Sequence, residues 1–493
     1  LFDIYLETRI FCSIFSEFCG IILLQQSVII NHHSFGARHM RRKFNPQLNL
    51  FMPVLRSKIA KELQAISAVL DATPKVLELV YQDMIRIARP TTGREGMTAE
   101  QVLRCAILKQ YRELTYEELA FHLEDSDSFR GFARLEMGQY PCKSILQDNI
   151  KALREETWEA IHREVLCYAK ESRVESGRKV RIDATAVETD IHHPTDSTLL
   201  ADGIRIITRW LAEGKELTPA PRYQYSDHTR VVKKRAMVIL NTKKEDVRKA
   251  AYHDLLLYAG KVRDYALQAI PELQGHQPAH ADELFAGKAL ADKLERAVGI
   301  LKKVISQTDR RVFKGETVPA HEKVVSFFED HTDIIVKNRR DTEYGHKVFF
   351  TGGASSMILD CLIVRGNPAD TEKYITMLER QKEIYLRMPR QVSADGGFAS
   401  RDNLAFAKSN QVKDAVFSKK RGLSVLEMAK SSWVYKKLRN FRAGIEAGIS
   451  TLKRAFGLDR CTWKGWEGFG RYVWSAVVSY NLLVLARTEL AKA

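Results

Sequence analysis

The stretch Lys179-Val-Arg-Ile-Asp-Ala-Thr-Ala-Val187 carries a clear strand pattern. Apolar residues from Val180 onward alternate with polar ones, and this period of two is typical of a half-buried β-strand. Asp183 lies in the middle of the stretch, although aspartate is depleted in strands. A surface charge on an edge strand would also explain an aspartate here. The stretch therefore predicts a strand that carries one candidate functional carboxylate.

Further strand patterns follow on the C-terminal side. Residues 345–351 and 357–364 are joined through Gly352-Gly353, as in a β-hairpin. We expect a helix over 368–387, a strand that ends at Asp395, a helix from about Ser400, a strand over 413–418, and then long helices. Residues 197–330, between the first strand and the hairpin, have helical and highly charged sequence. Without this insertion, the element order is that of the RNase H-like fold.

The N-terminal part of the chain reads as helical. Apolar residues at helical spacing predict a helix over 54–89. The sequences Thr98-Ala-Glu-Gln101 and Thr115-Tyr-Glu-Glu118 are typical of capping boxes and predict two helix starts. Short helices at this spacing, ending near residue 170, resemble a helix-turn-helix module that binds DNA, and plain helical packing is the alternative.

Together these patterns predict an α+β multidomain protein. We expect a helical DNA-binding region over residues 40–175, and a catalytic core with a mixed β-sheet over 176–196 and 331–493. Helices should cover both faces of this RNase H-like sheet. Residues 197–330 should form a helical insertion after the first catalytic strand.

Residues 1–39 differ from the rest of the chain. Their apolar run over 10–24 is interrupted by Glu17, is too short for a membrane span, and lacks the basic lead of a signal peptide. Met40 opens the basic segment Met40-Arg-Arg-Lys-Phe44. We therefore expect Met40 to be the natural start and residues 1–39 to be a non-native or upstream extension.

Composition narrows the classes of partner. The 493 residues contain 77 Lys and Arg against 61 Asp and Glu, a net charge of +16. Residues 401–470 alone hold 15 basic and 6 acidic side chains. Such a surplus favours nucleic acid or an anionic membrane, with a solvated basic face as the plain alternative. The seven cysteines form no Cys-x-x-Cys pair, so we expect reduced thiols in a cytoplasmic protein. The absence of a Walker loop and of His-Glu-x-x-His gives no support to ATP-driven or zinc-protease chemistry.

Two more acids complete a candidate site. Asp395 ends a predicted strand and precedes Gly396-Gly397, and Glu446 lies on a predicted helix. A turn residue and a helix salt-bridge partner are their respective alternative explanations. Carboxylates a few ångströms apart repel by roughly 4 kcal/mol at an effective dielectric of 20, so three together call for a cation. Mg²⁺ prefers oxygen ligands, and two ions roughly 3.5–4 Å apart activate an attacking oxygen and stabilise a leaving one.

The helix of Glu446 also carries basic residues on the same face. Arg442 and Lys453 lie at helical offsets that place them within roughly 40° of Glu446, so we expect them to hold phosphates. Gly444 and Gly448 would allow close packing of this helix on the sheet. The alternative is that the two glycines have no packing role and only lower the stability of the helix, by about 1 kcal/mol each relative to alanine.

These residues resemble the motifs of bacterial insertion-sequence transposases of the DDE type, in particular the group filed as "not classified yet" (ISNCY). The resemblance covers roughly residues 41–490. Its markers are Phe44-Asn-Pro-Gln47, Arg181-Ile-Asp-Ala-Thr-Ala-Val-Glu-Thr-Asp190, His193-Pro-Thr-Asp-Ser197, Ala394-Asp-Gly-Gly-Phe398 and the helix over 440–453. Related families carry Tyr-x2-Arg-x3-Glu-x6-Lys around the third acid, and this chain has Arg439 at the tyrosine position.

The resemblance implies Asp183, Asp395 and Glu446 as catalytic and metal-binding residues, with two Mg²⁺ or Mn²⁺ ions per site. It implies binding of terminal inverted repeats and target DNA, strand cleavage and strand transfer, by a homodimer or higher oligomer on DNA, with no membrane partner. A metal-dependent nuclease that cuts without joining is one alternative. A non-catalytic, transposase-derived DNA-binding protein is another.

Several other residues are weaker candidates. We expect the basic cluster Lys233, Lys234 and Arg235 in the insertion to clamp DNA. The adjacent His192 and His193 could touch DNA or metal, although loop histidines more often do neither. Trp463 and Trp466 could stack on an unpaired base, and packing at a helix corner is the commoner role.

Overall fold

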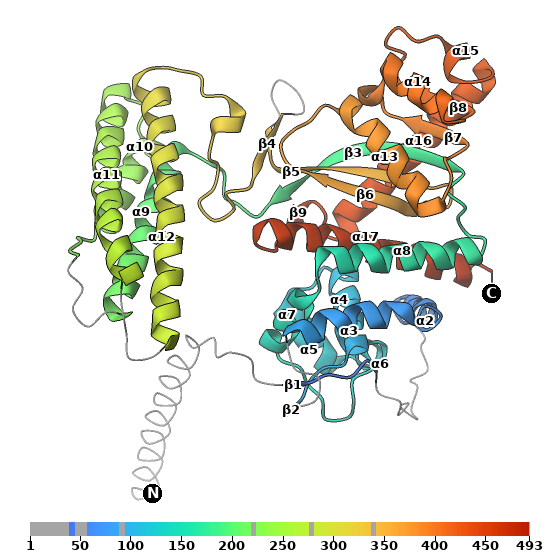
Figure 1. The fold of residues 1–493 in the computed structure, drawn as a ribbon, viewed down its shortest axis with the longest axis horizontal. Coiled ribbons are helices and arrows are strands. Elements are labelled where there is room, and N and C mark those ends of the chain that lie inside the picture. Colours follow the sequence, from blue (N-terminus) through green and yellow to red (C-terminus); the bar gives the residue numbers. More distant parts are fainter. Residues whose placement is uncertain are drawn as a thin grey trace, which may run out of the picture.

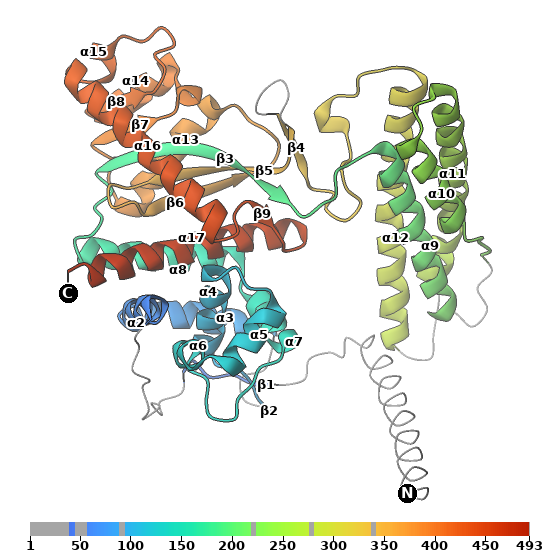
Figure 2. The same cartoon turned by 180° about the vertical axis from the view of Figure 1, so that it is seen from behind.

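The computed structural model describes residues 39–44, 57–87, 94–217, 223–275, 281–336 and 342–492. Residues 1–38, which hold nearly all of the expected extension, lie outside the described residues. Figures 1 and 2 show a mixed sheet with helices around it, a group of N-terminal helices below it, and a separate helical bundle at one side.

The sheet is built around β3 (Lys179–Thr189), the strand that the alternating stretch predicts. Its neighbours run in the order β6-β5-β3-β7-β8, with β5 antiparallel to β3 and β6 antiparallel to β5. On the other side β7 is parallel to β3, and β8 is parallel to β7. The predicted order of strands is confirmed, and it is consistent with an RNase H-like domain. The bounds are β5 Thr342–Gly352, β6 Ile358–Val364, β7 Gln391–Ala394 and β8 Asp414–Phe417.

Two short strands were not expected from the sequence. Strand β4 (Asp333–Val336) pairs with the first residues of β5, and β9 (Arg460–Cys461) pairs with the end of β3. Both are only a few residues long, so neither contains enough alternation to stand out from a loop. Together they extend the sheet at the end where the insertion leaves and rejoins the core.

Helices cover both faces of the sheet, as expected. Helix α16 (Ser432–Ala455) lies on the face that carries Arg181 and Asp183, since Arg181 donates a hydrogen bond to the carbonyl of Phe441 at 3.1 Å. The opposite face carries Phe349, whose ring packs on Phe398 beside helix α13. The remaining helices of this part are α13 (Asp370–Tyr385), α14 (Arg401–Ser409), α15 (Val425–Met428), α17 (Gly465–Leu490) and the short helix η3 (Gly396–Phe398).

The N-terminal helices form a compact group beneath α17. Both predicted capping boxes are present, at Thr98 and at Thr115. The single helix expected over 54–89 is wrong, because the chain breaks into two helices around Pro74, whose preceding residue is disfavoured in helical conformation. The helices are α2 (Lys58–Asp71), α3 (Lys75–Ile87), α4 (Ala99–Tyr111), α5 (Tyr116–Asp125), α6 (Asp127–Ala133), α7 (Lys143–Ala152) and α8 (Glu155–Glu171); β1 (His39–Met40) pairs with β2 (Arg94–Glu95).

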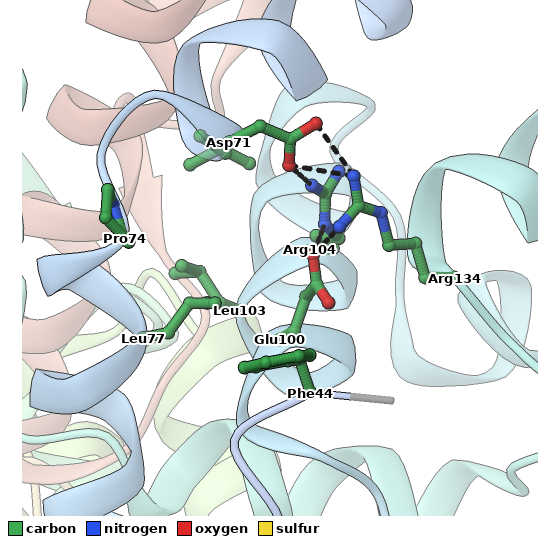
Figure 3. A pocket seen from close by; sticks show the side chains of 9 residues that line it. Phe44, Asp71, Pro74, Leu77, Glu100, Leu103, Arg104 and Arg134 are labelled. Atoms are coloured by element: carbon green, nitrogen blue, oxygen red, sulfur yellow. Dashed lines mark hydrogen bonds and ion pairs between the residues drawn. The ribbon is translucent and has the colours of Figure 1, made fainter. Parts of the chain in front are cut away.

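A charged network ties three of these helices together (Figure 3). Arg104 is only 1% exposed and bonds Asp71 at 2.7 Å and Glu100 at 3.0 Å. Arg134, just after α6, bonds the same two carboxylates. Two positive and two negative charges therefore neutralise each other beside a small cavity of about 250 Å³. Since every charge has a partner here, the network serves packing.

The insertion is a bundle of four long helices, α9 (Asp196–Leu217), α10 (Thr229–Asn241), α11 (Glu245–Gly275) and α12 (Ala281–Thr308). Its buried side chains form a hydrophobic cluster of their own, whereas the N-terminal helices and the sheet share one cluster. The turns η1 (Asp309–Phe313) and η2 (Ala320–Glu322) lead back to β4. The two connections meet at the core, where the hydroxyls of Thr189 and Thr332 are 2.8 Å apart. Within the described ranges, no helix is long and apolar enough to cross a membrane.

Candidate functional site

Asp183 lies on β3 with its side chain toward α16, and only 17% of that side chain is exposed. The N–H of Ala184 donates to its carboxylate at 2.8 Å. Burial is the main cause that raises the pKa of Asp183 to about 6. The hydrogen bond from Ala184 and the charge of Arg442 act against this rise, and the carboxylates of Asp395 and Glu446 contribute to it. A carboxyl in this position gains from a cation, because a cation favours its charged form.

Asp395 follows directly after β7, next to Asp183. Residue Ala394 pairs with Ile182, so the parallel strands bring the two aspartates to neighbouring positions. The Ser418 hydroxyl donates to the Asp395 carboxylate at 2.9 Å. Burial alone would raise the pKa of Asp395, but hydrogen bonds from Ser418 and the following backbone N–H groups, together with Arg442, hold it below its usual value. The strand therefore ends in a carboxylate that is fixed in its charged form.

Glu446 and Arg442 come from α16, one helical turn apart. The Arg442 guanidinium lies 3.0 Å from Asp183, 3.5 Å from Asp395 and 2.5 Å from Glu446. Three acids that are far apart in the sequence thus converge on one cation. The convergence of the carboxylates was expected, and so was a salt bridge between Arg442 and Glu446, as the alternative role of Glu446. The contacts of Arg442 with Asp183 and Asp395 were not expected.

This set of oxygen ligands fits a hard divalent cation such as Mg²⁺. In the structure, the positive charge of the Arg442 guanidinium partly neutralises the negative charge of the three carboxylates. Among the described residues, no three His, Cys, Asp or Glu side chains are close enough together to hold one ion. The two-ion site therefore stays a prediction, and loading it requires the guanidinium to move aside.

Tight packing holds α16 against the sheet. A side chain at Gly444 would collide with the guanidinium of Arg181, which itself lies over the ring of Phe441 at 4.7 Å. The expected close approach is therefore confirmed at Gly444. It is wrong at Gly448, where an added methyl group would lie 3.5 Å from the Tyr480 hydroxyl, an ordinary contact. Neither Arg181 nor Ser418 was singled out from the sequence, since nothing in their local sequence marks a role.

The other sequence candidates have no recorded contact with the three acids in the described part of the chain. Lys453 pairs with Asp459 at 3.3 Å, and Arg439 is exposed on α16. His192 lies 3.3 Å from Asp202, and the ring of His193 packs on Tyr344. The basic cluster lies on α10. Arg235 forms an ion pair with Asp254, whereas Lys233 and Lys234 are exposed.

The mixed sheet and its convergent acids are consistent with the RNase H-like class of DDE domains. Residues 315–482, about a third of the chain, match the family model described as "Transposase DDE domain". These residues therefore match a DDE transposase domain, and the resemblance to insertion-sequence DDE transposases is confirmed at this level. The narrower ISNCY group stays a prediction. Asp395 and Glu446 lie within the matched residues, and Asp183 precedes them. No curated protein and no solved structure matches the chain.

Proposed function

We propose that this protein is a transposase that binds the terminal inverted repeats of an insertion sequence and catalyses DNA strand cleavage and strand transfer. The convergence of Asp183, Asp395 and Glu446 on Arg442 carries the proposal. Such a concentration of carboxylates is costly for a purely structural site, and phosphodiester chemistry uses it.

Each side chain has a distinct role in this proposal. Asp183 and Asp395 are rigid ligands, because they belong to adjacent strands and are held by hydrogen bonds. Glu446 is 56% exposed and more adjustable. Arg442 compensates the acids in the free protein and holds a phosphate when DNA is bound. Bound Mg²⁺ or Mn²⁺ would supply an activated oxygen nucleophile and stabilise the leaving oxygen.

The DNA-binding surfaces are assigned to two further regions. We propose that the N-terminal helices read the transposon ends. Lys233, Lys234 and Arg235 on α10, with Arg439 and Lys453 on α16, would hold DNA phosphates. A homodimer or higher oligomer would bring the two ends together. The strong positive charge of the chain supports these roles, because phosphate contacts dominate DNA affinity.

The test is a set of single substitutions in the full chain. Asp183→Ala, Asp395→Ala and Glu446→Ala should each abolish Mg²⁺-dependent cleavage and joining while binding of the ends survives, because in-line displacement tolerates little misplacement. Double variants should lose little more, since the acids act as one unit. Glu427→Ala is the matched control, because Glu427 only completes a capping box with Ser424.

The same assay separates the alternatives. Cleavage without joining would support a nuclease of the same fold. End binding without either reaction, in the presence of Mg²⁺ or Mn²⁺, would support a non-catalytic DNA-binding protein. Near-normal cleavage by Glu446→Ala would show that another helix acid completes the site.

A further inference from the structure

A second hollow separates the helical insertion from the core. It has a volume of about 890 Å³, at the upper end of the range for ligand sites. One wall comes from α9 and α12 of the insertion. The other comes from the segment before β4, from Arg365 after β6, from Lys151 of α7, and from the start of α17 with the two residues before it. We refer to it as the junction cleft.

The junction cleft is strongly basic. Seven Lys and Arg side chains line it, against the two carboxylates of Asp330 and Glu467. These two acids already bind Arg296 and Arg471. Within the described residues, the other five cations form no ion pair with an acid, and all five are exposed: Lys151, Arg209, Lys293, Arg365 and Lys464. A polyanion is the ligand that this charge pattern favours.

Aromatic rings are interleaved with these charges. Phe328 is 49% exposed, and Trp466 is half-buried at the start of α17. Trp210 adds a third large ring from the insertion side. Aromatic rings placed between cations are typical of surfaces that bind single-stranded nucleic acid, because unpaired bases stack on the rings while the cations hold the phosphates.

The ring of Trp466 is held in a fixed orientation. His346 meets it edge to face at 4.9 Å, Phe469 stacks parallel to it at 6.3 Å, and Arg365 lies over it at 4.5 Å. His346 is itself fixed by hydrogen bonds of 2.7 Å to Asp333 and to His331. The buried His346 and Phe469 fix the orientation of the ring, so little ring freedom is lost when a base stacks on it. Arg365 occupies the place of the base in the free protein, and it has to move from the ring to a phosphate when a strand binds.

The junction cleft lies on the same face of the sheet as the three acids. His346 pairs directly with Val187, which shares its face with Asp183 because alternate residues of a strand point the same way. Val187 lies four positions after Asp183, which is roughly 13 Å along the strand. One DNA strand of a few nucleotides can span that distance.

We propose that the junction cleft binds an unpaired segment of DNA strand, with Trp466 as the stacking platform and the five unpaired cations on its phosphates. Duplex DNA is disfavoured as the occupant, since its bases are already stacked and cannot reach the rings. This inference rests on the proposed function, because it assigns the cleft to the strand that the acids process.

The experiment uses the full chain and a fluorescent oligo(dT) of about twelve nucleotides, with fluorescence anisotropy as the readout. Trp466→Ala should weaken binding about tenfold or more, in line with the energy of one base–aromatic stack. Trp433→Ala is the matched control, because Trp433 is an exposed tryptophan at the start of α16 and should leave the affinity unchanged. Binding of heparin, a polyanion without bases, should be the same in both variants.

A second variant guards against misfolding at Trp466. Arg209→Ala combined with Lys293→Ala changes only exposed helix positions and should weaken both oligo(dT) and heparin. Wild-type affinity for oligo(dT) in both the Trp466 and the Arg209–Lys293 variants overturns the proposal. Asp183→Ala should bind oligo(dT) normally, so its loss of cleavage tests the proposed function separately from the cleft.

Discussion

Arg442 contacts all three acids of the candidate site, and this position gives it a measurable effect on metal binding. Its guanidinium holds the place that a divalent cation needs, within 3.5 Å of each carboxylate. Arg442→Ala should therefore bind Mn²⁺ on the order of tenfold more tightly than the wild type, or about 1.4 kcal/mol, because the ion no longer has to displace a guanidinium whose ion pairs are partly screened by solvent.

Isothermal titration of the DNA-free protein with Mn²⁺ measures this effect. Arg439→Ala removes an exposed arginine from the same helix and should leave Mn²⁺ affinity unchanged. Equal or weaker Mn²⁺ binding by Arg442→Ala would mean that the guanidinium does not compete with the ion.

The buried His162 should make the stability of the fold depend on pH. It is 1% exposed on α8 and hydrogen-bonds the carbonyl of Ile358 at 2.9 Å. Burial lowers the pKa of His162 to about 4, so the folded protein keeps the ring neutral while the unfolded chain takes up a proton near pH 6.5. The contribution of the neutral His162 ring to the free energy of unfolding is therefore fully present above pH 6.5 and is lost as the pH falls toward 4.

The loss should be on the order of 3 kcal/mol in the free energy of unfolding. Urea unfolding at pH 7.5 and at pH 4.5 measures it. His162→Gln cannot titrate, so its urea midpoint should fall less between the two pH values than that of the wild type. An equal fall in both proteins would assign the acid sensitivity to other groups.

At the scale of elements, the contact between α16 and the sheet distinguishes two glycines of one helix. Gly444→Ala should destabilise the protein by about 1 kcal/mol, because the added methyl group displaces the Arg181 guanidinium from the Phe441 carbonyl, and this loss exceeds the helix propensity that alanine gains. Gly448→Ala should be neutral or stabilising by up to about 1 kcal/mol, since alanine favours helix and the site has room. Thermal unfolding of the two variants compares them, and equal shifts would show that α16 adjusts freely.

Elements with strong local signals could be predicted from the sequence. The alternation in β3, the glycine turn between β5 and β6, and the caps at Thr98 and Thr115 depend on neighbouring residues alone. Strand β4 exists only because β5 lies beside it, and no local pattern announces such pairing. The break near Pro74 was missed because helical periodicity resumes directly after it.

The candidate site, too, could be predicted from the sequence only in part. Its three acids could be chosen from their places within a strand, directly after a strand and on a helix. The position of Arg442 and the hydrogen bond from Ser418 depend on how side chains meet across elements, which spacing in the sequence does not determine.

At the scale of the whole molecule, the insertion should be separable from the rest. It has its own hydrophobic cluster, and its two connections meet at Thr189 and Thr332. A variant with residues 194–328 replaced by a short Gly/Ser linker should remain folded and monodisperse, with near-native circular dichroism for the remaining elements. It should bind oligo(dT) poorly, because one wall of the junction cleft is gone.

The N-terminal helices should behave in the opposite way. They share one hydrophobic cluster with the sheet, and Arg487 near the end of α17 bonds Glu62 of α2 at 2.7 Å. A fragment of residues 57–171 should therefore be aggregation-prone, and a fragment that folds well alone would contradict this shared core.

The central position of β3 also bears on how the protein is made. This strand leaves the ribosome early, but its partners β5 and β7 begin only at Thr342 and Gln391. The insertion can fold during this interval from its own local contacts. Strand β3 stays unpaired until its partners are made, and such long-range pairing is slow. Nascent chains therefore pass through a long stage with an unpaired central strand. Because Glu446 arrives later still, the three acids can converge only after most of the chain has been made.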